Sequence, residues 1–148
     1  MRLAGTEYSL QSKAFDIFIS GCTRNCPGCF NPESQDFSFG EPLNNKLLGN
    51  IALKIILASE LIDNIRLMGG DPMCQKESEI YWLSKVLRET FPKKSLHLYT
   101  GAELSEVPQW CLSIFDVIKT GEYKEELRQS EGLASSNQKL NVKGRDYL

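Results

Sequence analysis

The sequence predicts an α/β protein built as an open, partial (βα) barrel of reduced size with a parallel sheet. Short β-branched segments alternate with helical patterns, each of these segments runs into a glycine-containing loop, and the chain has only 148 residues. Alternating strands and helices are typical of parallel sheets with right-handed crossovers. A closed eight-stranded barrel usually needs about 250 residues, so we expect this barrel to be incomplete.

Four segments are predicted as the parallel strands because they are short, apolar or alternating, and bounded by glycine or polar turns. They cover residues 14–20, 64–68, 95–100 and 116–120. A further short strand is expected at the sheet edge over 139–142. The first thirteen residues have only a weak pattern, and residues 31–42 are rich in Pro, Gly, Ser and Asn, so the latter are expected to be irregular.

Three helices are predicted between these strands. Asn44 or Asn45 can cap the first, in which apolar residues recur at helical spacing up to Ile56. The second runs from Ser78 or Glu79 to Thr90 and stops before a proline. A shorter third helix is expected within residues 105–114.

Composition limits the class of protein. At 148 residues and 41% hydrophobic, the chain fits one domain over 1–148, with a core of about 14–122 and a C-terminal extension of about 123–148. A net charge of −2 without charge blocks argues against nucleic-acid binding. No apolar run suits a signal peptide or membrane helix, and five clustered cysteines do not look like a disulfide framework, so we expect a cytoplasmic protein.

The most informative stretch is the loop after the first strand, where Cys22, Cys26 and Cys29 lie within eight positions. Pro27 and Gly28 break helical hydrogen bonding there, so the segment must be a loop that can curl three thiolates toward one centre. Such spacing suits zinc or an iron–sulfur cluster, and both usually take four protein ligands. Three compact cysteines therefore suggest a metal centre with one open position.

The glycine loops that follow the other strands are expected to meet this cysteine loop. Residues 21–32, 69–72 and 100–101 each follow a predicted parallel strand. Ligands of such sheets bind at the carboxyl ends of the strands. We therefore expect the three loops to form one site.

The motifs in these loops and beyond resemble those of a known family. They are Cys22-Thr-Arg-Asn-Cys-Pro-Gly-Cys-Phe-Asn-Pro-Glu, Gly69-Gly-Asp-Pro, Tyr99-Thr-Gly, Gly121 with Tyr123, and Ser135-Ser-Asn-Gln. In this order they resemble the radical S-adenosylmethionine (SAM) enzymes and, within them, the anaerobic ribonucleoside-triphosphate reductase activating enzymes. The chain departs from the family where Thr120-Gly121 replaces Asp-Gly and where an N-terminal Asn-Gly-Pro-Gly segment is missing.

The resemblance implies an activase that works by radical chemistry. One 4Fe–4S cluster per chain would be bound by Cys22, Cys26 and Cys29, and SAM would chelate the fourth iron. After one electron arrives from a donor, SAM would yield methionine and a 5′-deoxyadenosyl radical. This radical would remove a hydrogen atom from a glycine loop of the large subunit of the anaerobic ribonucleotide reductase and leave a glycyl radical.

The resemblance also implies which residues bind SAM, beside Cys29. Gly69 and Gly70 would let the backbone approach the methionine part, and Asp71 would help to hold the amino group, alone or through the carbonyls of its loop. The remaining implied contacts are Phe30 with the Gly28 backbone near the adenine, and Thr100 near the carboxylate or ribose.

Other interpretations stay open at this level. The cluster of cysteines also fits a noncatalytic zinc or electron-transfer module, with Cys74, Cys111 or His97 as fourth ligand. Among enzymes, the alternatives are an activase of another glycyl radical enzyme and a radical SAM enzyme for a small molecule. The short chain argues against a closed small-molecule pocket. Lys119 would either pair with a carboxylate of SAM or the partner, or be solvated.

Overall fold

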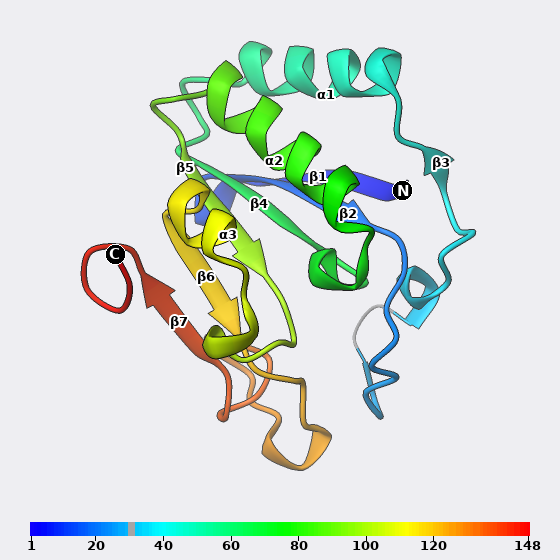
Figure 1. The fold of residues 1–148 in the computed structure, drawn as a ribbon, viewed down its shortest axis with the longest axis vertical. Helices are drawn as coiled ribbons and strands as arrows, with labels where there is room; N and C mark the ends of the chain where they lie inside the picture. The colour runs from blue at the N-terminus through cyan, green and yellow to red at the C-terminus, as the bar shows by residue number, and fades with distance from the viewer. Residues whose placement is uncertain (30–31) are drawn as a thin grey trace.

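The computed structural model describes residues 1–29 and 32–148, and within them the chain forms one sheet of seven strands (Figure 1). The strands are β1 (Arg2–Ser9), β2 (Ala14–Ile19), β3 (Glu41–Pro42), β4 (Asn64–Gly69), β5 (Ser95–Tyr99), β6 (Val117–Thr120) and β7 (Lys139–Val142). Their order across the sheet is β3-β1-β2-β4-β5-β6-β7, with β3 and β7 at opposite edges. The sheet is therefore open.

The four central strands, β2, β4, β5 and β6, pair in parallel, as predicted. Antiparallel pairing flanks them: β1 joins β2, β3 joins β1, and β7 joins β6. The expectation of an open α/β protein is confirmed, and the predicted edge strand over 139–142 is present. The expectation of a parallel sheet is correct only for the centre, because both margins are antiparallel.

Two strands were not expected from the sequence. β1 forms a hairpin with β2, in which Glu7 pairs with Asp16 and Ser9 with Ala14. Its central residues are polar and small and do not favour a strand by themselves. The backbone hydrogen bonds to the buried β2 stabilise it as a strand. β3 is two residues long and lies in the segment expected to be irregular, where it pairs with the start of β1.

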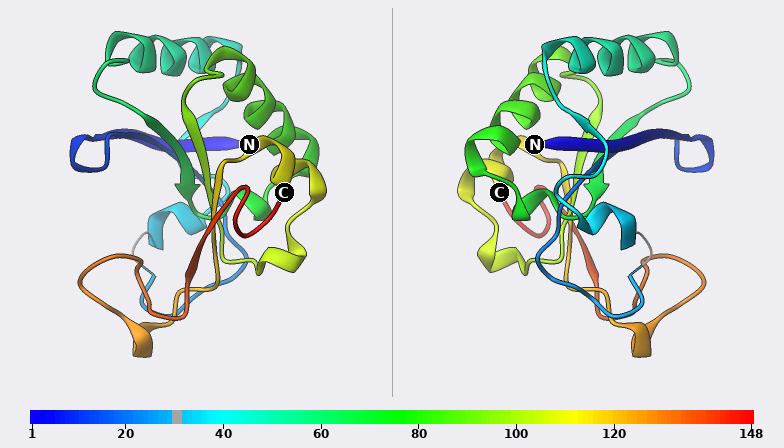
Figure 2. Two further views of the ribbon diagram at one scale, coloured as in Figure 1. Left: turned by 90° about the vertical axis from the view of Figure 1, so that its left-hand side faces the viewer. Right: turned by 90° about the vertical axis from the view of Figure 1, so that its right-hand side faces the viewer.

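Helices cover one face of this sheet (Figure 2). They are α1 (Asn45–Leu57), α2 (Glu77–Thr90) and α3 (Gln109–Ile114). The predicted cap of the first helix is Asn44, whose Oδ1 accepts a hydrogen bond of 2.9 Å from the backbone N–H of Leu47. The helices are short, and none in the described part of the chain is long and apolar enough to cross a membrane.

The core lies between the helices and the sheet. Alternate residues of the central strands face the helices and are at most 2% exposed: Phe15, Ile17, Ile19, Ile65, Leu67, Leu96, Leu98 and Ile118. Each helix contributes buried residues opposite them, such as Ile51 of α1, Leu83 of α2 and Cys111 of α3. This burial keeps the four parallel strands in register and fixes where their carboxyl ends lie.

The opposite face of the sheet carries polar and aromatic side chains. Arg66 of β4 forms a two-pronged ion pair with the buried Asp16 of β2, with N–O distances of 2.6 and 2.8 Å. The Arg66 guanidinium lies 5.7 Å, and the Lys119 ammonium 5.9 Å, from the centre of the Tyr99 ring. Arg66, Tyr99 and Lys119 also line the cavity described below.

His97 of β5 gives this face a pH-sensitive component. Burial lowers the pKa of His97 from 6.5 to about 4, and the neighbouring Arg66 charge adds to this effect. The unfolded chain therefore binds a proton near pH 6.5 that the folded protein rejects until about pH 4, so stability is lost as the pH falls through this window.

We expect the free energy of unfolding of the wild type to fall more between pH 7 and pH 5 than that of a His97→Gln variant, by roughly 1–2 kcal/mol. Urea titrations of both proteins at the two pH values measure this difference. Equal losses in the two proteins would show that His97 does not carry the pH dependence.

Candidate active site

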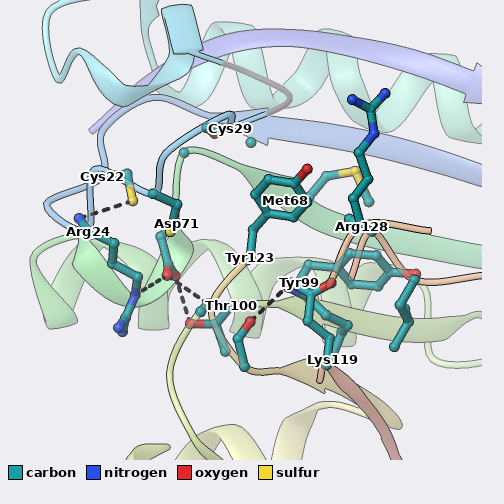
Figure 3. A pocket seen from close by; sticks show the side chains of 18 of the residues that line it. Cys22, Arg24, Cys29, Met68, Asp71, Tyr99, Thr100, Lys119, Tyr123 and Arg128 are labelled. Carbon is teal, nitrogen blue, oxygen red and sulfur yellow. Dashed lines mark hydrogen bonds and ion pairs between the residues drawn. The ribbon is translucent and has the colours of Figure 1, made fainter. Parts of the chain in front are cut away.

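The loops that follow β2, β4, β5 and β6 surround one cavity of about 940 Å³ (Figure 3). The predicted site residues that line it are Cys22, Cys26, Cys29, Gly69, Gly70, Asp71 and Thr100. Gly28 lies in the same loop but is not part of the lining, and Phe30 falls outside the described residues. The structure thus brings together residues from three separate loops, as the parallel order of the strands led us to expect.

The cysteine loop begins where β2 ends, and backbone hydrogen bonds hold it in place. Gly21 has a φ of 111° and donates a hydrogen bond to the carbonyl of Ser34, while its own carbonyl accepts one of 3.0 Å from the N–H of Asp71. A turn from Cys26 to Cys29, with an N–O distance of 3.2 Å, closes the far end. The thiols are thereby carried on a curled loop, as the proline and glycine suggested.

The spacing of the thiols bears on which metal group fits. Zinc–sulfur bonds of about 2.3 Å place the sulfurs of a tetrahedral site about 4 Å apart. Within the described residues, the compact group of metal-ligating side chains, with ligand atoms inside 4.8 Å of one another, consists of Cys22, Asp71 and Cys74, and does not unite the three motif thiols. Thiols that share a cavity at wider spacing suit separate irons of a cluster better than one zinc ion.

The predicted alternative ligands occupy different places. Cys74 lies beside Cys22, and their hydrogen bond, together with burial, raises the pKa of the Cys22 thiol. Cys111 is fully buried in the core, 3.9 Å from the sulfur of Met73. His97 lies on β5, where Nε2 is 3.0 Å from the hydroxyl of Ser95. Neither Cys111 nor His97 lines the cavity.

Asp71 connects three loops through one buried carboxylate. Its Oδ1 accepts hydrogen bonds from the Met73 N–H (2.9 Å) and the Thr100 hydroxyl (2.8 Å). Its Oδ2 accepts from the Gly101 N–H (2.9 Å) and from Arg24 Nε (2.8 Å). The side chain is 2% exposed, and the four donors occupy the hydrogen-bond acceptor sites of both carboxylate oxygens. Asp71 is therefore suited to shape its loop, and less suited to grip a ligand itself.

Arg24 is one of the residues of this site that sequence reasoning missed. Besides the ion pair with Asp71, its Nη1 lies 3.4 Å from a carboxylate oxygen of Glu122, which follows β6. Gly101 makes room for it, since a Cβ there would be 2.5 Å from Arg24 Cδ. The signal was weak because a single arginine between two cysteines does not show partners 47 and 98 residues away.

We expect an Arg24→Met variant to lose roughly 2 kcal/mol of stability, because it leaves the buried Asp71 carboxylate without its counter-charge. The exposed Arg145, replaced in the same way, is the matched control and should change stability by less than about 0.5 kcal/mol. Urea unfolding of both variants measures the effect. Equal, small losses would mean that the Arg24 ion pair does not hold the loops together.

The two glycines of the second loop are required by the protein's own backbone. Gly69 has a φ of 110°, and a Cβ there would lie 2.5 Å from the backbone N and O of Ile19. A Cβ on Gly70 would lie 2.5 Å from the carbonyl oxygen of Gly21 and closer still to that of Ser34. The close approach inferred from the sequence is thus explained in the first place by packing against the cysteine loop.

The segment after β6 forms the remaining wall of the cavity. Tyr123 lies over the middle of the cavity in Figure 3; Arg128, Lys119 and Tyr99 also line it, with the Lys119 ammonium near the Tyr99 ring. Burial lowers the pKa of Lys119, while the negative charge of Asp71 opposes this shift. Burial also raises the pKa of Cys26, and a hydrogen bond from the backbone of Tyr123 opposes it. Several of these wall residues had no role in the sequence-based site.

Comparison with known proteins finds one matching family model and several similar proteins that share one name. Residues 13–141 match the model of a family described as 4Fe-4S single cluster domain. The chain is 30% identical to the anaerobic ribonucleoside-triphosphate reductase-activating protein of Enterobacteria phage T4, over 84% of this chain and 80% of the phage protein. It is 28% identical to the protein of the same name from Escherichia coli K12, over 82% and 83%. No solved structure matches the chain significantly.

Proposed function

The chain belongs to the 4Fe–4S single cluster domain family and to the family of anaerobic ribonucleoside-triphosphate reductase-activating proteins, and we propose that it generates the glycyl radical of an anaerobic ribonucleotide reductase. The observation that carries this proposal is the shared cavity. Three motif cysteines border it from one loop, and the Gly69–Asp71 and Thr100–Gly101 loops border it from two others.

Cys22, Cys26 and Cys29 are the residues that would hold the cluster, and the set of three leaves one iron for SAM. When bound and reduced by a one-electron donor, the cluster would supply the electron for reductive cleavage of SAM, the source of the radical that acts on the glycine of the reductase large subunit. The three thiols are half-buried and line the same cavity, which supports this assignment.

The chain's own residues would orient SAM. The backbone of Gly69 and Gly70 would border the methionine part, and the hydrogen bonds to Asp71 would keep the carbonyls and amides of this loop in place. Thr100 would act in the same indirect way, since its hydroxyl donates to Asp71 and accepts a 3.1 Å hydrogen bond from the Ala102 N–H. We retain Gly28 and Phe30 as the proposed neighbours of the adenine.

The size of the cavity and the uncovered face of the sheet beside it support a protein substrate. Cofactor pockets commonly measure about 300–1,000 Å³, and this cavity of about 940 Å³ lies at the upper end of that range. The helices lie on the other face of the sheet, so they do not cover the face that carries Arg66, Tyr99 and Lys119 (Figure 2). A glycine loop of the reductase would enter from this open side.

Three further parts of the proposal follow from the same family membership. The open sheet would be a reduced form of the partial barrel of radical SAM enzymes. Residues 1–148 would act as one domain, in which 123–148 extend the core of 14–122. The reaction would take place in the cytoplasm, because a cluster with an open iron needs a reducing environment.

A spectroscopic experiment tests the cofactor assignment. The protein is reconstituted anaerobically with iron and sulfide, reduced, and examined by electron paramagnetic resonance with and without SAM. We expect a 4Fe–4S signal that changes shape when SAM is added, because SAM would bind the open iron directly. A signal that SAM leaves unchanged would contradict the proposal that the fourth position is its site.

A further inference from the structure

The motif Ser135-Ser136-Asn137-Gln138 directly precedes β7, and no role has been assigned to it above. We propose that Ser135, Asn137 and Gln138 are positioning residues, which hold residues 121–125 against the cysteine loop and so set the hydrogen bonding around the cluster thiolates. The inference rests on the proposed function, because it requires that these thiolates carry a cluster.

Two buried side chains of the motif are hydrogen-bonded to each other and to residues 121–125, the segment that follows β6. Ser135 is fully buried, and its hydroxyl accepts a hydrogen bond of 3.2 Å from the Lys124 N–H. Gln138 is 8% exposed. Its Oε1 accepts a 3.2 Å hydrogen bond from the Ser135 N–H, and its Nε2 donates one of 3.1 Å to the Gly121 carbonyl. The Gln138 amide therefore bonds to the motif through its oxygen and to Gly121 through its nitrogen.

Asn137 adds a third connection. Its Nδ2 donates a hydrogen bond of 2.9 Å to the carbonyl of Glu122. The motif thus binds backbone groups of Gly121, Glu122 and Lys124, three of four consecutive positions. Such side-chain bonds replace a regular ladder in a segment that has no strand partner, and they fix its backbone.

The segment held in this way contacts the cysteine loop at three successive points. The carboxylate of Glu122 accepts from Arg24 at 3.4 Å, and the backbone N–H of Tyr123 donates to the Cys26 sulfur. The Glu125 carboxylate lies against Gly28, where a Cβ would overlap it. The contacts follow the same order along the two segments, so a shift of residues 121–125 would disturb all of them together.

These contacts matter for a cluster because hydrogen bonds to cysteine sulfurs raise its reduction potential and partners behind the ligands orient them. The Tyr123 N–H is such a donor, and its position depends on a backbone that the motif holds on both sides, at Gly121 and Lys124. Loosening the motif should therefore remove the donor and make the cluster harder to reduce. A motif that only anchored β7 would not affect the cluster in this way.

The test compares Ser135→Ala with Ser136→Ala. Ser136 is the adjacent serine, exposed, and holds its place through a backbone hydrogen bond to Leu127, so its hydroxyl is a matched control. Hydrogen exchange by mass spectrometry reports on the segment, and a redox titration of the reconstituted protein without SAM reports on the cluster. A Gln138→Met variant, which removes two of the bonds while keeping a similar volume, repeats the test at a second position.

We expect the amides of 121–125 to exchange about fivefold faster in Ser135→Ala, which loses one hydrogen bond of about 1 kcal/mol, and about 30-fold faster in Gln138→Met, which loses two. We also expect the midpoint potential of the cluster to shift to more negative values, with Ser136→Ala unchanged in both measurements. Faster exchange with an unaltered potential, or no change in either, overturns the inference while the proposed function stands. A wild-type protein that holds no cluster refutes the proposed function and this inference with it.

Discussion

A Cys26→Ala variant, reconstituted anaerobically with iron and sulfide, should fail to hold a 4Fe–4S cluster and should lose essentially all SAM cleavage. Cys26 lines the cavity from the middle of the cysteine loop, and a cluster held by only three cysteines would be left with two of them. The same loss is expected for Cys22→Ala and Cys29→Ala. Iron and sulfide content, the brown absorbance of the cluster and 5′-deoxyadenosine formation measure the effect.

Two other cysteines supply controls for this prediction. Cys111→Ala should keep the cluster, because Cys111 lies in the core beside Met73. Cys74→Ala should keep it as well, although Cys74 neighbours Cys22, because the proposal leaves the fourth iron to SAM. Loss of the cluster in Cys74→Ala alone would identify Cys74 as a fourth ligand and contradict the open position.

The second large effect is expected for Gly70→Ala. The new Cβ would lie 2.5 Å from the Gly21 carbonyl oxygen and closer to that of Ser34, and both obstacles are backbone atoms that cannot rotate away. We expect a loss of stability of about 3 kcal/mol or more, together with displacement of the cysteine loop. Urea unfolding of the variant measures the first effect, and its iron content after reconstitution measures the second.

Gly49 provides the matched control for this substitution. It lies inside α1, where nothing stands within 4 Å of a Cβ. Alanine favours helices over glycine by up to about 1 kcal/mol, so Gly49→Ala should be neutral or stabilising. If Gly70→Ala proved as stable as the wild type, the close packing of the two loops would not hold in solution.

The central strands and helices were predictable because the pattern that indicates each one lies within its own short stretch of sequence. β2 is apolar almost throughout and is followed closely by Gly21, and the α1 cap at Asn44 is encoded within four residues. β1 was missed because its pattern is weak and its partner creates it. The parallel arrangement of these strands then followed from their alternation with helices, whereas the antiparallel margins depend on pairings that no local pattern shows.

Some features of the site were also predictable from local sequence, and others were not. The cysteine spacing and the glycine loops are local patterns, and the parallel order of strands explains why they meet. The interactions of Arg24 with Asp71 and Glu122, and the saturation of the Asp71 carboxylate, join positions far apart in the chain. Only the folded arrangement reveals that Asp71 organises the loops, or that Glu122 and Tyr123 lie against the cysteine loop.

The most direct test of the proposed activity uses the reduced, cluster-loaded protein, SAM and a purified anaerobic ribonucleotide reductase large subunit. We predict that 5′-deoxyadenosine forms together with a glycyl radical signal in electron paramagnetic resonance, and that this signal is absent when the Cys26→Ala variant replaces the wild type. Formation of 5′-deoxyadenosine without a glycyl radical on the reductase would contradict the assignment of this partner.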